Sequence, residues 1–204
     1  MLAERYCPAE MSEDILKSRQ NHHCLVRIYL GRRRLMHQTQ RRLKFFSLRN
    51  FPLHADQVEE LNLPSEAYTK GMAEALANLH WRVRTDGADV EFFLGAPRGI
   101  ENADYPLAEH SLWMLDYDCS RPIEADETGL RAIARAFWRK DPYFPRPSAT
   151  DVQSQSLWEI FSAEYRRVGR EIVKAYPREG EDMEALLALV DDALTMIEDT
   201  KGKF

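Results

Sequence analysis

The feature that most constrains the fold is the order in which two hydrophobic periodicities follow one another. Short runs rich in β-branched and aromatic residues recur in the first 115 residues, and apolar residues at three- and four-residue spacing dominate the remainder. Short apolar runs of the first kind favour strands, and the second spacing favours amphipathic helices. Strands early and helices late predict an α+β domain rather than strands and helices in regular alternation.

Four short antiparallel strands are expected, at 24–30, 45–51, 90–94 and 112–115. The first two enclose a basic segment, and we predict that they pair as a β-hairpin whose long tip includes Arg32, Arg33 and Arg34. Pro52 is expected to end the second strand, since proline cannot donate a ladder hydrogen bond. The last two strands flank a Gly- and Pro-containing insert at 95–109, which predicts an exposed loop.

Helices are expected at 54–61, 65–81, 128–140, 154–176 and 182–200. Ser65 is predicted to cap the second of them. Three prolines in 141–147 exclude a helix there and predict an ordered or extended linker.

The chain of 204 residues fits one domain, divided into a basic hairpin region at 1–54 and a mainly helical region at 55–204. The first region holds 11 Lys and Arg against 4 Asp and Glu, and the second holds 17 against 29. Because the net charge is −5, we expect no nucleic-acid partner. Arginine side chains suit anions, so Arg32 to Arg34 could contact an acidic protein partner, form a nuclear localisation signal, or be a solvated loop.

No apolar run reaches the roughly 18 residues that a bilayer requires, and the first residues lack a secretory signal. Three widely spaced cysteines argue against disulfides and fit a reducing compartment. We therefore expect an intracellular, cytoplasmic protein with no membrane partner, with nuclear location and homo-oligomers left open. No metal is expected, because His22-His23-Cys24 provides at most half of a zinc site.

A loop and the two strands after it resemble the C-terminal lobe of protein kinases and aminoglycoside-phosphotransferase-like enzymes. In those families an Asp is followed five positions later by an Asn and then by an apolar strand. Here Asp86 falls on the Asp, Glu91 falls on the Asn, and Asp116 falls on the metal-holding Asp after the next strand. The resemblance implies a kinase-like C-terminal lobe that lacks most of the nucleotide lobe, since no Gly-rich loop precedes it.

Phosphoryl transfer needs a carboxylate to orient the attacking hydroxyl and oxygen ligands to hold Mg²⁺, and these three acids could supply both. The sequence departs from the kinase pattern at Arg84 and Thr85, which replace the His and Arg of the loop. Because of these departures we expect no cofactor, and Mg²⁺ would be one only if the chain is phosphotransferase-like.

Several longer strings resemble a family of uncharacterised fungal proteins labelled "zinc finger protein", with a domain of unknown function. They are CLVRIYLGRR at 24–33, FFSLRNFPLH at 45–54, MAEAL at 72–76, DVEF at 89–92, LDYD at 115–118 and DPYFPRP at 141–147. The resemblance covers roughly residues 5 to 165. It implies no established reaction, and Ala88 stands where the family commonly has Asn.

The leading hypothesis is a domain that binds a small molecule in a cleft lined by Asp86, Glu91 and Asp116. It could be an acid–base enzyme of metabolism, including secondary metabolism, that does not use ATP, with Asp86 or Asp116 transferring the proton. The other expected ligand-binding residues are Arg49, Arg84, Tyr117 and Asp118. The alternatives are a non-catalytic protein-interaction module and a Mg²⁺-ATP phosphotransferase completed by a partner lobe. Whether the chain is an enzyme stays open at this point.

Overall fold

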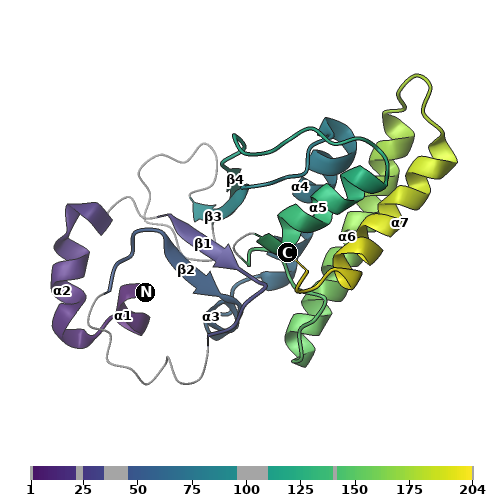
Figure 1. Cartoon of the computed structure of the whole chain (residues 1–204). Helices are drawn as coiled ribbons and strands as arrows, with labels where there is room; N and C mark the ends of the chain where they lie inside the picture. Colours follow the sequence, from purple (N-terminus) through teal and green to yellow (C-terminus); the bar gives the residue numbers. More distant parts are fainter. Residues whose placement is uncertain (1, 22–24, 35–45, 96–109, 140–141, 204) are drawn as a thin grey trace.

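A small sheet lies between two N-terminal helices and a layer of longer helices (Figure 1). The structure is a computed structural model that describes residues 2–21, 25–34, 46–95, 110–139 and 142–203. It confirms the α+β class. Outside the described residues lie 96–109 of the loop predicted at 95–109, most of the basic segment and the His22-His23-Cys24 string.

The sheet has four strands in the order β2-β1-β3-β4. They are β1 (Val26–Tyr29), β2 (Phe51–His54), β3 (Glu91–Gly95) and β4 (Ser111–Leu115). β3 and β4 are antiparallel, with Glu91 opposite Leu115, so both of these predicted strands are confirmed. The residues just after β4 therefore lie beside the start of β3.

The predicted hairpin is wrong, because β1 and β2 pair in parallel, with Val26 opposite Phe51. About twenty residues separate the two strands, which is enough for a crossover connection. The second strand also begins at Phe51, where the predicted one ended, and it contains Pro52. Because β2 is an edge strand, the missing N–H of Pro52 can face outwards.

The two N-terminal helices were not predicted. They are α1 (Leu2–Tyr6) and α2 (Ala9–Lys17), followed by a 3-10 turn at Arg19–Asn21. The Tyr6 ring stacks on Phe51 with centroids 6.1 Å apart, which attaches α1 to the start of β2.

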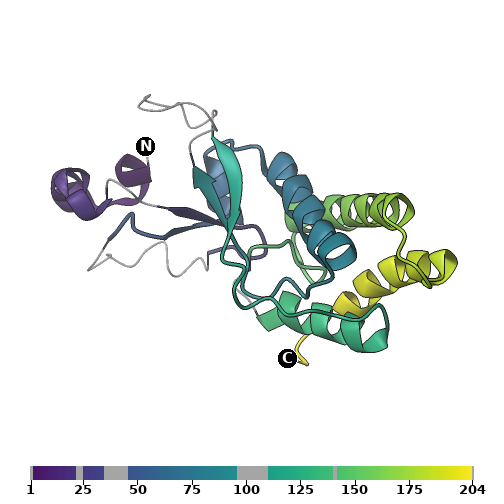
Figure 2. The same cartoon turned by 90° about the horizontal axis from the view of Figure 1, so that it is seen from above.

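The five predicted helices are all present, with ends that differ by a few residues. They are α3 (Ala55–Glu60), α4 (Ser65–Ala77), α5 (Glu127–Arg139), α6 (Val152–Ala175) and α7 (Met183–Asp199). α4 continues into a π-helical turn at Asn78–Val83. Ser65 does not cap α4, because it is already the first helical residue and the N-cap is Pro64. α6 packs on α4, and α7 packs on both α5 and α6 (Figure 2).

The proline-rich segment joins the sheet to the helices. The Leu30 N–H donates to the Tyr143 carbonyl at 3.0 Å, and the Gly31 N–H donates to the Pro142 carbonyl at 2.8 Å. Phe144 is buried, and its ring lies 5.6 Å from Phe92 of β3. The segment is therefore ordered and extended, and it forms part of the core rather than a surface linker.

The described helices include none with the length and apolar character needed to cross a lipid bilayer.

Candidate functional site

The loops around the predicted site hold three residues in the left-handed region that non-glycine residues rarely adopt. These are Arg84 (φ 66°), Asp89 (φ 69°) and Asp116 (φ 68°). Such conformations are costly and tend to persist where the surrounding structure fixes them, often at functional sites. The loop before β3 and the end of β4 are thus the first places to look for function.

Asp86 forms hydrogen bonds that join the loop before β3 to the loop after β4. Its Oδ1 accepts hydrogen bonds from the backbone N–H groups of Ala88 at 3.0 Å and Arg121 at 2.9 Å. The Asp86 N–H in turn donates to the Arg121 carbonyl at 2.9 Å. The carboxylate is therefore engaged by backbone donors, and its position is explained by the folding of the loop.

Arg84 is engaged by the connection between α6 and α7. Its guanidinium donates to both carboxylate oxygens of Glu181, at 3.0 and 3.1 Å, and lies over the Trp81 ring. Burial lowers the pKa of Arg84, and Glu181 opposes that effect. The structure does not bring Arg84 together with Glu91 and Asp116.

Arg49 also lies apart from these acids. It precedes β2, which begins opposite Val26, and Val26 is opposite Leu94 at the far end of β3 from Glu91. Arg49 is thus at the opposite end of the sheet from the Glu91–Leu115 pair, just before the edge strand β2.

The cation that the structure does place beside the predicted acids is Arg27 of β1. It forms an ion pair with Glu91 of β3 at 2.9 Å, with about a quarter of its side chain exposed. Its guanidinium also lies over the Phe93 ring. Sequence reasoning missed Arg27 because the run at 24–30 was interpreted only as a strand. A charge inside an apolar run was the available signal.

Asp116 and Asp118 interact directly after β4. A hydrogen bond with Asp118 raises the pKa of Asp116 above its usual value, and the positive charge of Arg27 opposes this rise. Both acids are exposed. Tyr117 between them is 49% exposed, and its hydroxyl donates to the Met114 carbonyl at 2.8 Å. The turn thus places two exposed carboxyl groups next to each other, and their interaction raises the pKa of Asp116.

We call the group formed by Arg27, Glu91, Asp116 and Asp118 the Asp116 site. Three strands contribute to it, because Arg27 lies on β1, Glu91 on β3 and the two aspartates directly after β4. Within the described parts of the chain, no three His, Cys, Asp or Glu side chains are placed to share a metal ion. Asp86, Glu91 and Asp116, which the resemblance to kinases assigned to orienting a hydroxyl and to holding Mg²⁺, do not form such a group.

A buried polar network lies under the Asp86 loop. The Tyr165 hydroxyl accepts a hydrogen bond from Trp81 Nε1 at 2.9 Å and lies 2.7 Å from His80 Nδ1. Burial lowers the pKa of His80 to about 3. Sequence reasoning missed this network because its members are about 85 residues apart.

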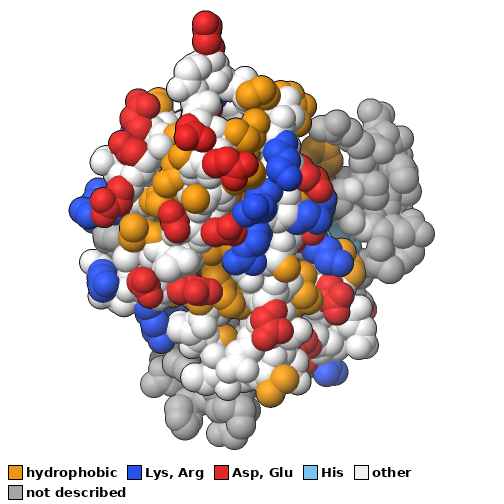
Figure 3. Space-filling model, turned by 90° about the vertical axis from the view of Figure 1, so that its right-hand side faces the viewer, with side chains coloured by type: hydrophobic (Ala, Val, Ile, Leu, Met, Phe, Trp, Pro, Cys, Tyr) orange, Lys and Arg blue, Asp and Glu red, His pale blue; other side chains and the backbone are white. Residues whose placement is uncertain are grey.

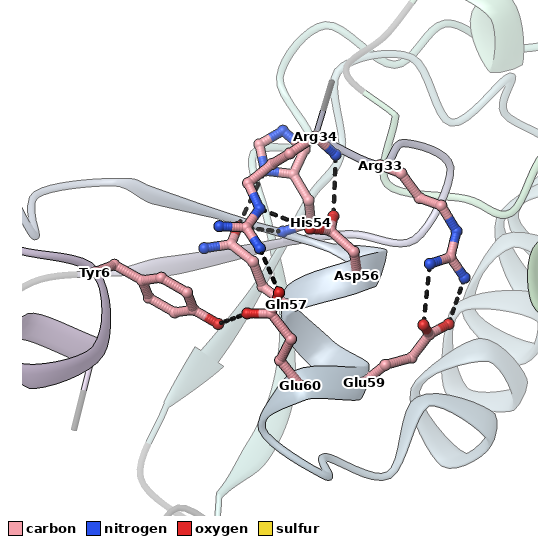
Figure 4. Close-up of polar contacts among 8 residues, drawn as sticks. All are labelled: Tyr6, Arg33, Arg34, His54, Asp56, Gln57, Glu59 and Glu60. Atoms are coloured by element: carbon pink, nitrogen blue, oxygen red, sulfur yellow. Dashed lines mark hydrogen bonds and ion pairs between the residues drawn. The ribbon is translucent and has the colours of Figure 1, made fainter. Parts of the chain in front are cut away.

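Two of the three arginines predicted to contact a partner are paired within the chain (Figure 4). Arg34 donates to Asp56 at 2.6 Å and to Glu60 at 2.8 Å. Arg33 makes a two-pronged contact with Glu59, at 2.9 and 2.5 Å. Arg32 is exposed. Arg33 and Arg34 therefore attach the end of β1 to α3 in this structure.

Residues 112–177 match the model of a family described as "Zinc finger protein", a domain of unknown function. The match runs from β4 to just beyond α6 and includes Asp116, Tyr117 and Asp118. No curated protein and no solved structure matches the chain. The resemblance to a kinase lobe and the fungal assignment thus stay predictions from sequence. The comparisons add that the segment containing Asp116 and Asp118 is similar to an uncharacterised family.

Proposed function

We propose that the chain binds a small hydroxyl- or amine-bearing metabolite at the Asp116 site, with Asp116 as the proton-transfer group. The observation that carries the proposal is the left-handed conformation of Asp116 at the end of β4. Glycine would adopt this conformation without strain. An aspartate there supplies a carboxyl group at the cost of backbone strain, which is a pattern of functional sites.

The pairing with Asp118 gives Asp116 a chemical capability that an isolated surface aspartate lacks. Neighbouring carboxyl groups oppose each other's ionisation, and the hydrogen bond with Asp118 raises the pKa of Asp116. Asp116 can donate to a ligand oxygen when it is protonated and can accept from a hydroxyl or an ammonium group when it is ionised. This arrangement supports general acid–base chemistry.

In this proposal Arg27 has the ligand-binding role that the sequence analysis gave to Arg49 and Arg84. It lies close enough to lower the pKa of Asp116, and its ion pair with Glu91 fixes its position. An anionic group of the ligand could contact this guanidinium while a hydroxyl or amine meets the two aspartates. Asp86 has a positioning role in this proposal, because it joins the loop before β3 to the turn after β4.

The test is a thermal-shift titration of the full chain with spermidine, glucosamine and Mg²⁺-ATP as separate probes. A ligand that binds only the folded state raises the unfolding midpoint. The matched variants are Asp116→Asn and Asp14→Asn, since Asp14 is an exposed aspartate of α2 remote in sequence from the site.

We expect a shift with an amine or hydroxyl probe that disappears in Asp116→Asn and persists in Asp14→Asn. A shift with Mg²⁺-ATP alone, lost in Asp116→Asn, would favour the phosphotransferase alternative instead. No shift with any probe, or an equal shift in Asp116→Asn, would contradict the proposal.

A further inference from the structure

A groove between α5 and α7 combines an apolar floor with an acidic rim. Its volume is about 270 Å³. The floor consists of Leu130, Leu189 and Met196, and the rim consists of Glu127, Asp192, Thr195 and Asp199. This groove is separate from the Asp116 site, and the function proposed above does not use it.

The acids on the α7 side of the groove are unneutralised. Asp192 and Asp199 are exposed, and neither forms an ion pair with any residue that the structure describes. The neighbouring Asp191 differs, because it pairs with Arg166 at 2.7 Å and Arg170 at 2.8 Å. Asp191, on the side of α7 towards α6, is thus paired with arginines, whereas Asp192, which lines the groove, has no ion-pair partner among the described residues.

The spacing places these acids in a row along the helix. Asp192 and Asp199 are seven residues apart, which is about two turns or roughly 10 Å along one face. Met196 lies between them on the same face. α7 carries five acids and no Lys or Arg. In Figure 3, which views the side of the molecule that bears α6 and α7, red side chains lie among orange ones, while blue side chains form one cluster and also occur near the edges.

The C-terminal end of α7 carries charge of the unfavourable sign. The last turn holds Glu198 and Asp199 and no basic residue, although the helix dipole favours cations there. Glu198 is accounted for, since it accepts a hydrogen bond from Trp158 Nε1 at 3.1 Å. Asp199 has no such partner among the described residues. Lys201 and Lys203 follow the helix, but among the described residues neither forms an ion pair with Asp199, so this acid is available to a basic partner.

The groove is also held in shape by its surroundings. Trp138 Nε1 at the end of α5 donates to the Ile197 carbonyl of α7 at 2.8 Å. Val190 and Ile197 anchor the opposite face of α7 in the core. A partner would meet a surface already formed, which reduces the entropy lost on binding.

We propose that this groove binds a basic amphipathic helix of a partner protein. Charge complementarity selects this occupant, because lysines or arginines about two turns apart would meet Asp192 and Asp199 while leucine-like residues between them cover Leu189 and Met196. Amphipathic helices are commonly recognised in this way, with apolar anchors in a groove and charges at its edges. A flexible methionine in the floor suits such contacts.

The experiment is fluorescence anisotropy with the full chain and a labelled 16-residue helical peptide that has leucines on one face and lysines at its flanks. Two control peptides carry glutamates in place of the lysines, or the same residues in scrambled order. The test variant is Asp192→Lys with Asp199→Lys. The matched control is Glu10→Lys with Glu179→Lys, which makes the same charge change at exposed positions outside the groove.

We expect the basic peptide to bind wild type and the control variant, and to bind the groove variant at least about tenfold more weakly. The affinity should fall as salt is raised, and both control peptides should bind more weakly. Equal binding to the groove variant, or no binding to wild type, would overturn the proposal. A dimer of the chain that forms without peptide and is lost in the groove variant would assign the groove to a second copy, and would also overturn it.

Discussion

The Asp86 carboxylate accepts a hydrogen bond from the backbone N–H of Arg121, 35 residues further along the chain, at 2.9 Å. The same two residues are joined by a second bond, from the Asp86 N–H to the Arg121 carbonyl. Together these bonds hold the loop before β3 against the turn after β4. Asp86, which the sequence predicted as a candidate proton-transfer group, therefore acts here by fixing the positions of two loops next to the Asp116 site.

Asp86→Ala is expected to lower the free energy of unfolding by about 1–2 kcal/mol, because two backbone donors lose their acceptor. Asp86→Asn keeps an acceptor oxygen, so its cost should be smaller. Urea unfolding of both variants measures the difference. The Asp86→Asn variant should also retain any ligand-induced thermal shift; its complete loss in this stable variant would show that the charge of Asp86 itself acts on the ligand.

His80 makes stability depend on pH in a predictable direction. Burial lowers its folded-state pKa to about 3, whereas an unfolded histidine has a pKa of about 6.5. Between these values the unfolded chain binds the extra proton, so stability falls as pH falls through this window and is fully present above it. The slope from this one group is about 1.4 kcal/mol per pH unit.

The control for this prediction is His80→Gln, which removes the titrating group and retains a hydrogen-bonding side chain toward Tyr165. Unfolding free energies measured from pH 7 to 4.5 should fall less steeply in the variant than in wild type. Parallel curves for the two proteins would refute the assignment of this slope to His80.

Gly31→Ala is expected to be strongly destabilising. A Cβ at this position would lie 2.2 Å from the Phe144 carbonyl oxygen, which is a backbone atom, so the end of β1 must move away from the proline-rich segment. The two backbone hydrogen bonds there would weaken, and overpacking of this kind costs about 1–3 kcal/mol.

Gly71→Ala provides the comparison, since its Cβ would meet only the Leu112 side chain at 3.3 Å. That flexible side chain can give way, and alanine favours the helix, so a change within about 1 kcal/mol is expected. Chemical denaturation compares the two variants. Similar stabilities would mean that the contact between Gly31 and Phe144 is not maintained in solution.

The helices α3 to α7 could be predicted from the sequence because each of them carries its own signal, which the short N-terminal helices α1 and α2 lack. α7, for example, follows the capping residue Asp182, whose side chain accepts from the Glu184 and Ala185 N–H groups. Strand pairing carries no such local signal. β1 pairs on one side with β3, which is more than sixty residues away, and on the other side with β2, which runs parallel to it.

The candidate site could be predicted only in part, because some of its residues belong to local sequence patterns and others are brought together by long-range pairing. Asp116 was identified because it ends a strand, and the strand is a local pattern. Its neighbours Arg27 and Asp118 gain their importance from the register of three strands and from a turn. Arg84 was predicted to hold a ligand, but its left-handed backbone and its contact with Glu181 depend on the α6–α7 connection. No pattern of nearby residues encodes that contact.

The most direct test of the central claim is an NMR titration of the aspartate side-chain carboxyl carbons in wild type and in Asp118→Asn. The account predicts that Asp116 titrates with a raised pKa in wild type, and that the pKa returns toward the usual aspartate value when Asp118 can no longer share the proton. A wild-type Asp116 that titrates at the usual value, or whose raised pKa is unchanged in Asp118→Asn, would contradict it.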